Sequence, residues 1–193
     1  LVFNGEIYNF LDLKKEIIEL TSNKNIFKSK GDSEVILIGY KIFGFEKLLS
    51  KLEGMFAFAI WDESKKSLYL ARDRLGEKPL YYSNDTNNGL IFSSSVKSII
   101  SHPDLIHKKK IDISSIDQYL SFNYLLFEKT FFSGVKSLEP GSYLIFDKNN
   151  NSNIVEKKYW KLENCFKNEE IKKLKFVDAK KRLSSLIKSS VSS

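Results

Sequence analysis

LEGMFAFAIWD, residues Leu52 to Asp62, is the stretch of this 193-residue sequence that says most about its fold. From Met55 onward, apolar side chains fill both alternating sets of positions, so the two faces of the predicted strand are equally hydrophobic. A strand of this kind is covered on both faces. The segment therefore predicts a central strand that lies between two layers of structure.

The chain after this strand predicts an antiparallel meander. A polar turn at Glu63 to Lys66 leads into the next strand, and the turn residues from Asn84 to Gly89 close a later hairpin. The strands predicted besides the central one are Ser67 to Asp73, Leu80 to Tyr82, Leu90 to Ser93, Leu138 to Phe146 and Ile154 to Trp160.

Helices are predicted before and after the meander. Leu13, Ile17 and Leu20 recur at helical spacing behind Asn9 or Asp12, either of which can cap the helix. Helices on both sides of an antiparallel meander favour an α+β domain. Further helices are predicted from Asp32 as N-cap to Phe43, over Phe45 to Glu53, from Ser94 or Ser95 to Ile100, over Ile113 to Phe122 with Ser114 or Ser115 as cap, and over Phe176 to Val191.

The composition is that of an ordinary globular chain. With 42% hydrophobic and 28% charged residues, the sequence is unlike disordered, collagen or coiled-coil proteins. No apolar run approaches the roughly 18 residues of a membrane helix, so no membrane contact is expected. Cys165 is the single cysteine and no secretory signal is recognisable, which indicates a reducing, cytoplasmic location.

The net charge of +7 is concentrated at one end of the chain. Residues 156–193 carry 11 Lys and Arg against 5 Asp and Glu. Because the two signs are interleaved, the segment is interpreted as a solvated face or linker, and no nucleic-acid partner is expected. His102 and His107 have no acidic or cysteine partner at metal-binding spacing, so no metal site is expected either.

Several short motifs occur in a fixed order. They are VFNGEIYN (Val2 to Asn9), GDSEVIL (Gly31 to Leu37), LEGMFAFAIWD, LYLARDRLGEKPLYY (Leu68 to Tyr82), LIFSSSVKSI (Leu90 to Ile99), LEPGSYLIF (Leu138 to Phe146) and KYW (Lys158 to Trp160). Together they resemble the glutaminase domain of glutamine-hydrolysing asparagine synthetases, which are class II amidotransferases. The resemblance implies an N-terminal-nucleophile fold: a four-layer αββα sandwich with antiparallel sheets, incomplete here at the N-terminus.

The resemblance also implies a site. Glutamine hydrolysis passes through a tetrahedral oxyanion, and the family's Asn-Gly pair, here Asn4 and Gly5, supplies its hydrogen-bond donors. Asp32 and Glu6 match the residues that hold the amino-acid end of glutamine. Without the resemblance, Asn4 and Gly5 would be read as a turn and Asp32 as a helix cap. A structural role is expected for the motif residues Arg72, Asp73, Arg74, Gly76, Lys78 and Pro79, whose charges could form buried pairs.

The sequence departs from the family pattern at both of its ends and at Ser95. The family nucleophile is an N-terminal cysteine with its free amino group as base, whereas residue 1 is Leu. We expect truncation at both ends, an upstream segment with the cysteine and a substrate-binding arginine, and no activity in the chain alone. Cys165 lies in the variable linker and is not a substitute. Ser95 stands where the family commonly has Glu.

The expected domains are a partial glutaminase domain over residues 1–162, and a linker with the first helix of a synthetase domain over residues 163–193. No cofactor is expected in these residues; ATP and Mg²⁺ would belong to the missing synthetase domain. The expected partners are glutamine, that domain in cis and a second copy in a homodimer. Two alternatives remain: an amidotransferase that acts on another carboxylate, and a non-catalytic glutamine-binding module.

Overall fold

The computed structural model describes residues 1–193 except 85–88, 108–109, 151–152, 167–172 and 192–193. The chain divides into two compact units, Leu1–Tyr159 and Trp160–Ser193. The second unit contains α7 (Leu162–Cys165) and α9 (Phe176–Val191). None of the helices among the described residues has the length and hydrophobicity needed to cross a membrane.

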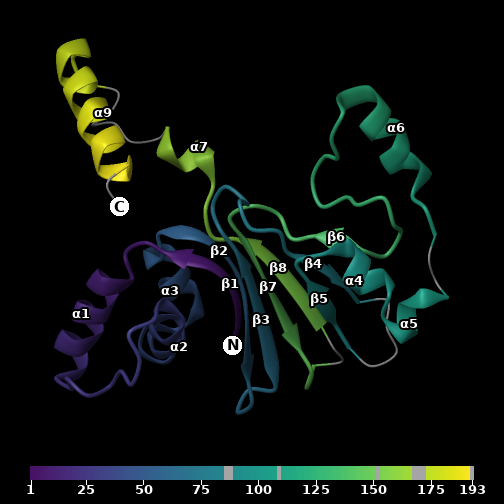
Figure 1. The fold of residues 1–193 in the computed structure, drawn as a ribbon, viewed down its shortest axis with the longest axis horizontal. Coiled ribbons are helices and arrows are strands. Elements are labelled where there is room, and N and C mark those ends of the chain that lie inside the picture. Colours follow the sequence, from purple (N-terminus) through teal and green to yellow (C-terminus); the bar gives the residue numbers. More distant parts are fainter. Residues whose placement is uncertain (85–88, 108–109, 151–152, 167–172, 192–193) are drawn as a thin grey trace. The chain divides into compact units, whose positions relative to one another are not determined.

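A five-stranded antiparallel sheet forms the centre of the first unit (Figure 1). Its strands run in the order β1-β2-β3-β7-β8, so β1 and β8 are its two edges. The strands are β1 (Val2–Ile7), β2 (Gly54–Asp62), β3 (Ser67–Arg72), β7 (Ser142–Asp147) and β8 (Asn153–Lys158).

The prediction that β2 is buried on both faces is confirmed. Phe56, Phe58 and Ile60 belong to a core shared with three helices on one face of the sheet. Ala57 and Ala59 point to the opposite face and belong to a second core. The three helices are α1 (Phe10–Thr21), α2 (Asp32–Phe43) and α3 (Phe45–Lys51).

The predicted single meander is wrong, because the chain changes sheets after β3. A second, three-stranded sheet has the order β5-β4-β6, with β4 (Tyr81–Ser83), β5 (Ile91–Ser93) and β6 (Lys136–Ser137). Leu80 and Tyr82 pack beside Leu144 in the core that contains Ala57 and Ala59. A small second sheet covers this face, and alternation along the strands does not reveal which sheet a strand joins.

A third core completes the predicted four layers. It contains Ile99, Leu105 and Val135 and joins the second sheet to α4 (Val96–Ile100) and α5 (Pro103–Ile106). The layers of the first unit are therefore helix, sheet, sheet and helix, in an α+β arrangement as expected (Figure 1). Ser95 is the N-cap residue of α4, and its backbone N–H donates to Ser93 Oγ over 3.1 Å.

The helix α6 (Ile113–Phe122) has the predicted bounds but a different cap. Its N-cap is Asp112, whose carboxylate accepts hydrogen bonds from the N–H of Ser114 and from the hydroxyls of Ser114 and Ser115. The two serines predicted as caps therefore donate to the cap residue.

Candidate functional site at the β1 edge

The N–H of Gly5 points away from the sheet. Along an antiparallel strand, backbone groups of successive residues point to opposite sides, so residues two apart point the same way. The N–H of Ile7 donates to Asp32 Oδ2 over 3.1 Å, and Tyr8 N–H donates to Glu53 O at the start of β2. The backbone N–H of Ile7 therefore points away from β2, and the backbone N–H of Gly5 points the same way.

The partner of Gly5 on β2 gives the same result. Gly5 lies opposite Phe56, and Phe56 exchanges hydrogen bonds with Asp73 on the far side of β2. Phe56 O accepts from Asp73 N over 2.8 Å, and Phe56 N donates to Asp73 Oδ2 over 3.3 Å. Because Phe56 turns its backbone away from β1, the Gly5 N–H is left as a donor at the sheet edge.

Position 5 requires glycine. Its φ of +145° is rare for residues with a side chain, and a Cβ there would lie 2.1 Å from Met55 O and 2.7 Å from Phe56 Cα. Both of these are backbone atoms of the neighbouring strand. A side chain at position 5 would therefore push β1 off β2.

Asn4 and Glu6 project from the face opposite the helices. Phe3 and Ile7 pack into the helix-side core, so the residues between them face the other way. Asn4 and Glu6 are both exposed. Among the described residues, none hydrogen-bonds to the Asn4 side-chain amide, which lies one residue from the outward N–H of Gly5.

Asp32 does not cap α2 as predicted. The N-cap is Gly31, and the Asp32 carboxylate reaches across to Ile7 N–H instead. This bond joins the first turn of α2 to the outer side of β1. Sequence spacing cannot reveal it, because the two residues are 25 positions apart. The structure thus brings all four predicted residues, Asn4, Gly5, Glu6 and Asp32, to the β1 edge.

Tyr8 and Glu77 also lie at this edge and were not predicted. Burial raises the pKa of Tyr8, and the negative charges of Glu77, Glu6 and Asp73 raise that pKa further. These carboxylates therefore create a negative field around the end of β1. The sequence signal was weak, since Tyr8 and Glu77 stand inside family motifs without any distinguishing pattern.

Asp73 holds β2 and the following loop together. It is buried, and its carboxylate accepts from the N–H of Phe56, Leu75, Glu77 and Lys78 over 3.0 to 3.3 Å. The predicted structural role therefore fits its contacts. Because Phe56 lies opposite Gly5, Asp73 also fixes the strand against which the candidate site is built.

Arg72 forms none of the ion pairs found among the described residues. Its guanidinium donates to the carbonyls of Lys78, Gly76 and Leu138 and to Ser137 Oγ, over 2.7 to 3.1 Å. Burial lowers its pKa. The idea of buried charge pairs in this motif is replaced here by hydrogen bonds from an arginine to carbonyl oxygens.

Two motif side chains hold the turn from α3 into β2. Asn9 donates to Lys51 O over 2.9 Å and accepts from Glu53 N over 3.0 Å. Arg74 donates to Leu52 O over 3.2 Å, while its buried Nε has no partner among the described residues. Of the two predicted caps, Asn9 and Asp12, Asn9 is the N-cap residue of α1, although its side chain bonds to this turn.

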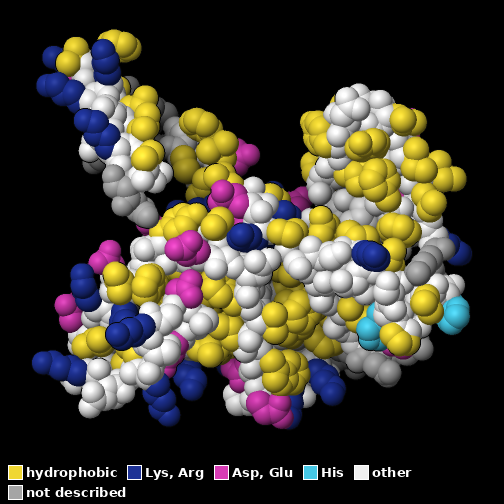
Figure 2. All heavy atoms as spheres, in the orientation of Figure 1, with side chains coloured by type: hydrophobic (Ala, Val, Ile, Leu, Met, Phe, Trp, Pro, Cys, Tyr) yellow, Lys and Arg dark blue, Asp and Glu magenta, His cyan; other side chains and the backbone are white. Residues whose placement is uncertain are grey.

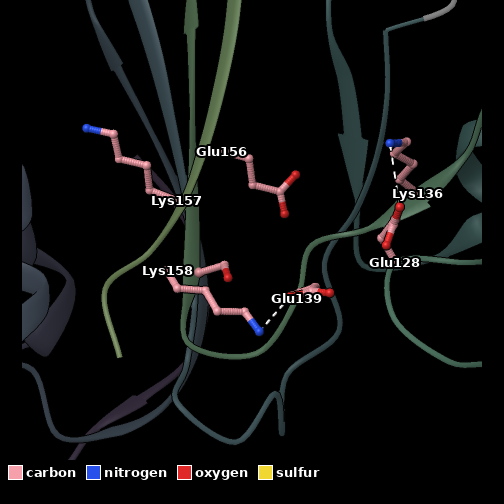
Figure 3. Close-up of a pocket in the computed structure, with 7 residues that line it drawn as sticks. Glu128, Lys136, Glu139, Glu156, Lys157 and Lys158 are labelled. Carbon is pink, nitrogen blue, oxygen red and sulfur yellow. Dashed lines mark ion pairs between the residues drawn. The ribbon is translucent and has the colours of Figure 1, made fainter. Parts of the chain in front are cut away.

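A cavity of about 290 Å³ lies at the other edge of the sheet (Figure 3). β1 and β8 are separated by three strands, or roughly 19 Å at ordinary strand spacing. In the cavity Lys158 pairs with Glu139 and Lys136 with Glu128, and Tyr82 donates to Glu156 over 2.8 Å. Lys157, which also lines the cavity, pairs with Glu46 outside it. The cavity holds none of the predicted site residues.

The β1 edge presents hydrogen-bond donors beside carboxylates, a combination that suits an anionic group and a cationic group of one ligand. Its exposed groups are amide donors and carboxylates, and the described residues contain no group of three or more His, Cys, Asp or Glu that could hold a metal ion. Cys165, the single cysteine, is exposed on α7 of the second unit.

Comparison with known proteins assigns the family. The glutamine amidotransferase domain family matches residues 1–160. Asparagine synthetase [glutamine-hydrolyzing] 3 of Bacillus subtilis is 36% identical over 164 residues, which are 84% of this chain and 25% of that protein. Amidase chry2 of Gibberella zeae is 32% identical over 165 residues, 84% of this chain and 22% of that protein. The chain thus spans about a quarter of the length of these curated relatives.

A solved structure confirms the fold. The glutamine phosphoribosylpyrophosphate amidotransferase of B. subtilis, complexed with ADP and GMP, aligns with a TM-score of 0.52 at 19% identity, over 82% of this chain and 28% of that one. The predicted N-terminal-nucleophile type of α+β sandwich is therefore correct. Since the family match covers most of the sequence, this chain belongs to the glutamine amidotransferase domain family.

Proposed function

We propose that the β1 edge binds L-glutamine and that Asn4 and Gly5 stabilise the oxyanion formed when its side-chain amide is hydrolysed. The observation that carries this proposal is the outward N–H of Gly5 beside the side-chain amide of Asn4, which has no hydrogen-bond partner among the described residues. Two preplaced donors at adjacent positions suit a tetrahedral oxyanion, and loss of one such donor typically lowers kcat by about 10²- to 10³-fold.

In this proposal Asp32 binds the α-ammonium of glutamine. Its Oδ2 accepts from Ile7 N–H, while its Oδ1 has no partner among the described residues. One oxygen thus fixes the carboxylate and the other stays available for a cation. Glu6, exposed on the neighbouring face of β1, would add a second negative charge near the amino-acid end.

The reaction would follow the chemistry of the family. A cysteine thiolate attacks the amide carbon, the C–S bond forms, and the oxyanion is held by Asn4 and Gly5. The C–N bond then breaks, and ammonia leaves with a proton delivered by the amino group of the N-terminal cysteine. Water then attacks the thioester, the C–S bond breaks, and glutamate and the free cysteine thiol are released. We propose that this cysteine belongs to a segment outside the 193 residues.

The whole protein is proposed to be a glutamine-hydrolysing asparagine synthetase, like the Bacillus relative. Residues 1–162 would form part of its glutaminase domain, and residues 163–193 would form a linker and the first helix of a synthetase domain. The exposed Leu183, Leu186 and Ile187 on α9 support this, because they form an apolar stripe without cover among the described residues. ATP and Mg²⁺ would bind in the later domain, and no residue of this chain is assigned to them.

A second candidate is an amidotransferase with a different acceptor. The observation that favours it is the relative named an amidase, which matches the same share of this chain as the synthetase does. Both candidates use the same glutamine site. Formation of asparagine from aspartate, ATP and glutamine by the complete natural polypeptide separates them.

The glutamine site is tested by steady-state glutaminase kinetics on the complete natural polypeptide. We expect Asn4→Ala to lower kcat by about 10²-fold or more with a smaller change in KM. Asp32→Asn should chiefly raise KM. Asp12→Asn, at an exposed position on α1, is the matched control. Unchanged kcat in Asn4→Ala would remove Asn4 from the oxyanion hole.

A further inference from the structure

Helix α6 presents its apolar side chains to solvent. Ile113 is 79% exposed and Leu120 is 77% exposed, whereas the buried residue of the helix is Ser115. A helix on the surface of a domain normally turns its apolar stripe inward. α6 therefore buries none of its large apolar side chains in its own unit.

The segment after α6 enlarges the same apolar surface. Phe122, Tyr124 and Phe127 are 52%, 58% and 74% exposed. Figure 2 shows hydrophobic side chains gathered over α6. We call this the α6 surface, and its members are Ile113, Ile116, Tyr119, Leu120, Phe122, Tyr124 and Phe127.

The segment that carries the surface is a closed structure. A bridge between Ile111 and Phe132 joins its two ends, and Ser133 N–H donates to Lys110 O over 2.9 Å. Thr130 is buried and donates to Val135 O over 2.8 Å, next to the third core. The segment that carries the exposed apolar side chains is thus held in place at both of its ends. Contiguous apolar surface of this kind marks an interaction site.

The charges of the segment identify the kind of partner. α6 contains one charged residue, Asp117, and no Lys or Arg. Helices that bind membrane surfaces or nucleic acid carry basic residues beside their apolar face. Lys110 stands three positions before α6, at the closed end of the segment, where its carbonyl accepts from Ser133 N–H. Lys129, which follows α6, donates to Ser114 Oγ over 2.6 Å. A charge-poor, aromatic-rich surface fits the apolar surface of another protein domain.

We propose that the α6 surface is the docking surface for the domain that follows residues 1–193 in the same polypeptide. The proposal rests on the proposed function, under which a synthetase domain follows residues 1–193; the match covers 25% of the Bacillus relative, so three quarters of that protein lie outside it. A domain of that size, tethered through the second unit, is present at high effective concentration. The α6 surface is the largest group of exposed apolar residues that one continuous segment of the first unit offers to it.

The base of this surface is bonded to the motif that supports the candidate site. Ser137 N–H donates to Glu128 O over 2.8 Å, and Ser137 Oγ and Leu138 O accept from Arg72. Arg72 is followed by Asp73, which fixes Phe56 opposite Gly5. Docking on α6 would therefore place the following domain in a defined relation to the glutamine site.

Photocrosslinking tests the proposal. Benzoylphenylalanine replaces Leu120 in the complete natural polypeptide, and it replaces Leu20 on α1, which is 62% exposed, as the matched control. We expect the probe at position 120 to crosslink to residues beyond 193 of the same polypeptide several-fold more than the probe at position 20. Mass spectrometry locates the crosslinked peptide. The variant Ile113→Lys should weaken this crosslink without changing the melting temperature of residues 1–193.

Each other outcome overturns the proposal. A crosslink from position 120 to a second copy, seen as a dimer band, would make the surface a homodimer contact. Equal crosslinking from positions 120 and 20 would mean that nothing docks on α6. Glutaminase activity is assayed in the same samples, so failure of the glutamine site registers separately from failure of docking.

Discussion

The β1 edge and the α6 surface use polar and apolar side chains in opposite ways. Around β1, buried polar groups such as Asp73 bind backbone N–H groups, and the apolar side chains of Phe56 and Ile7 lie inside. In α6 Ser115 is the buried residue, and the large apolar side chains of Ile113 and Leu120 are exposed. The polar contacts around β1 hold the backbone of the first unit in place. The apolar side chains of the α6 surface do not pack into the core of that unit.

The contrast shows that buried polar groups stabilise the unit that contains them, whereas exposed apolar groups leave a surface available for contacts outside it. A buried carboxylate with four N–H donors gives rigidity, because each donor would be unsatisfied without it. Exposed isoleucine and leucine side chains contribute little to the stability of the unit that carries them. Substitutions in the two regions should therefore differ sharply in their effect on folding.

Gly5→Ala should cause the largest loss of stability. Strained backbone at φ +145° and a Cβ 2.1 Å from Met55 O act together, and we expect the free energy of unfolding of residues 1–193 to fall by about 4 kcal/mol. Gly44→Ala is the control. Gly44 also has positive φ, +77°, but beyond its chain neighbours no described residue has an atom within 4 Å of the place its Cβ would take. Urea unfolding measures both. Equal losses would show that the close approach of β2 is unimportant.

Asp73→Ala should have the next largest effect. Four backbone N–H groups lose their acceptor, three of them in one loop, and the expected loss is about 3 kcal/mol. Asp12→Ala removes a carboxylate that is 80% exposed and should stay within about 0.5 kcal/mol of the parent. If the two alanine variants unfold at the same urea concentration, Asp73 does not hold this region together.

Asp62 lies at the far end of β2 and should make stability depend on pH. Hydrogen bonds from the hydroxyls of Ser64 and Tyr40 hold the pKa of Asp62 far below its ordinary value. Because the folded pKa is the lower one, the stabilisation is complete above about pH 4 and is lost as the pH falls below it.

Asp62→Asn tests this dependence. The variant should be less stable than the parent by about 1 kcal/mol at pH 7, and the gap should close as the pH is lowered through about 4 toward 2. Thermal unfolding at a series of pH values measures the difference in stability between the parent and the variant. Because the other carboxylates titrate in both proteins, their contribution cancels in this difference. A constant gap at every pH would contradict the lowered pKa.

Leu120→Ala should have the smallest effect on residues 1–193. Leu120 is 77% exposed, so its truncation should change the free energy of unfolding by less than about 0.5 kcal/mol. Leu70→Ala, at a fully buried position of β3, should cost about 2 to 5 kcal/mol. The two leucine variants compare an exposed position with a buried one for the same substitution. Similar losses would mean that α6 packs against its own unit in solution.

Much of the fold was predictable because its signals are local. The burial of β2 on both faces follows from its alternating residues, and the bounds of α6, Ile113–Phe122, follow from apolar spacing between polar turns. The resemblance predicted two sheet layers, but the pattern did not show which strands form the second sheet, since β4 has three residues and β6 has two. Such short strands carry no periodicity that could show which sheet they join.

The sequence by itself determined which residue types stand at the candidate site. The order of its motifs pointed to the family and predicted that Asn4, Gly5, Glu6 and Asp32 belong to one site. Tertiary structure alone decided how these residues are arranged. The direction of the Gly5 N–H depends on the register of β1 against β2, where a shift of one residue would reverse it. The bond from Ile7 to Asp32 depends on packing between segments 25 residues apart, which no local pattern encodes.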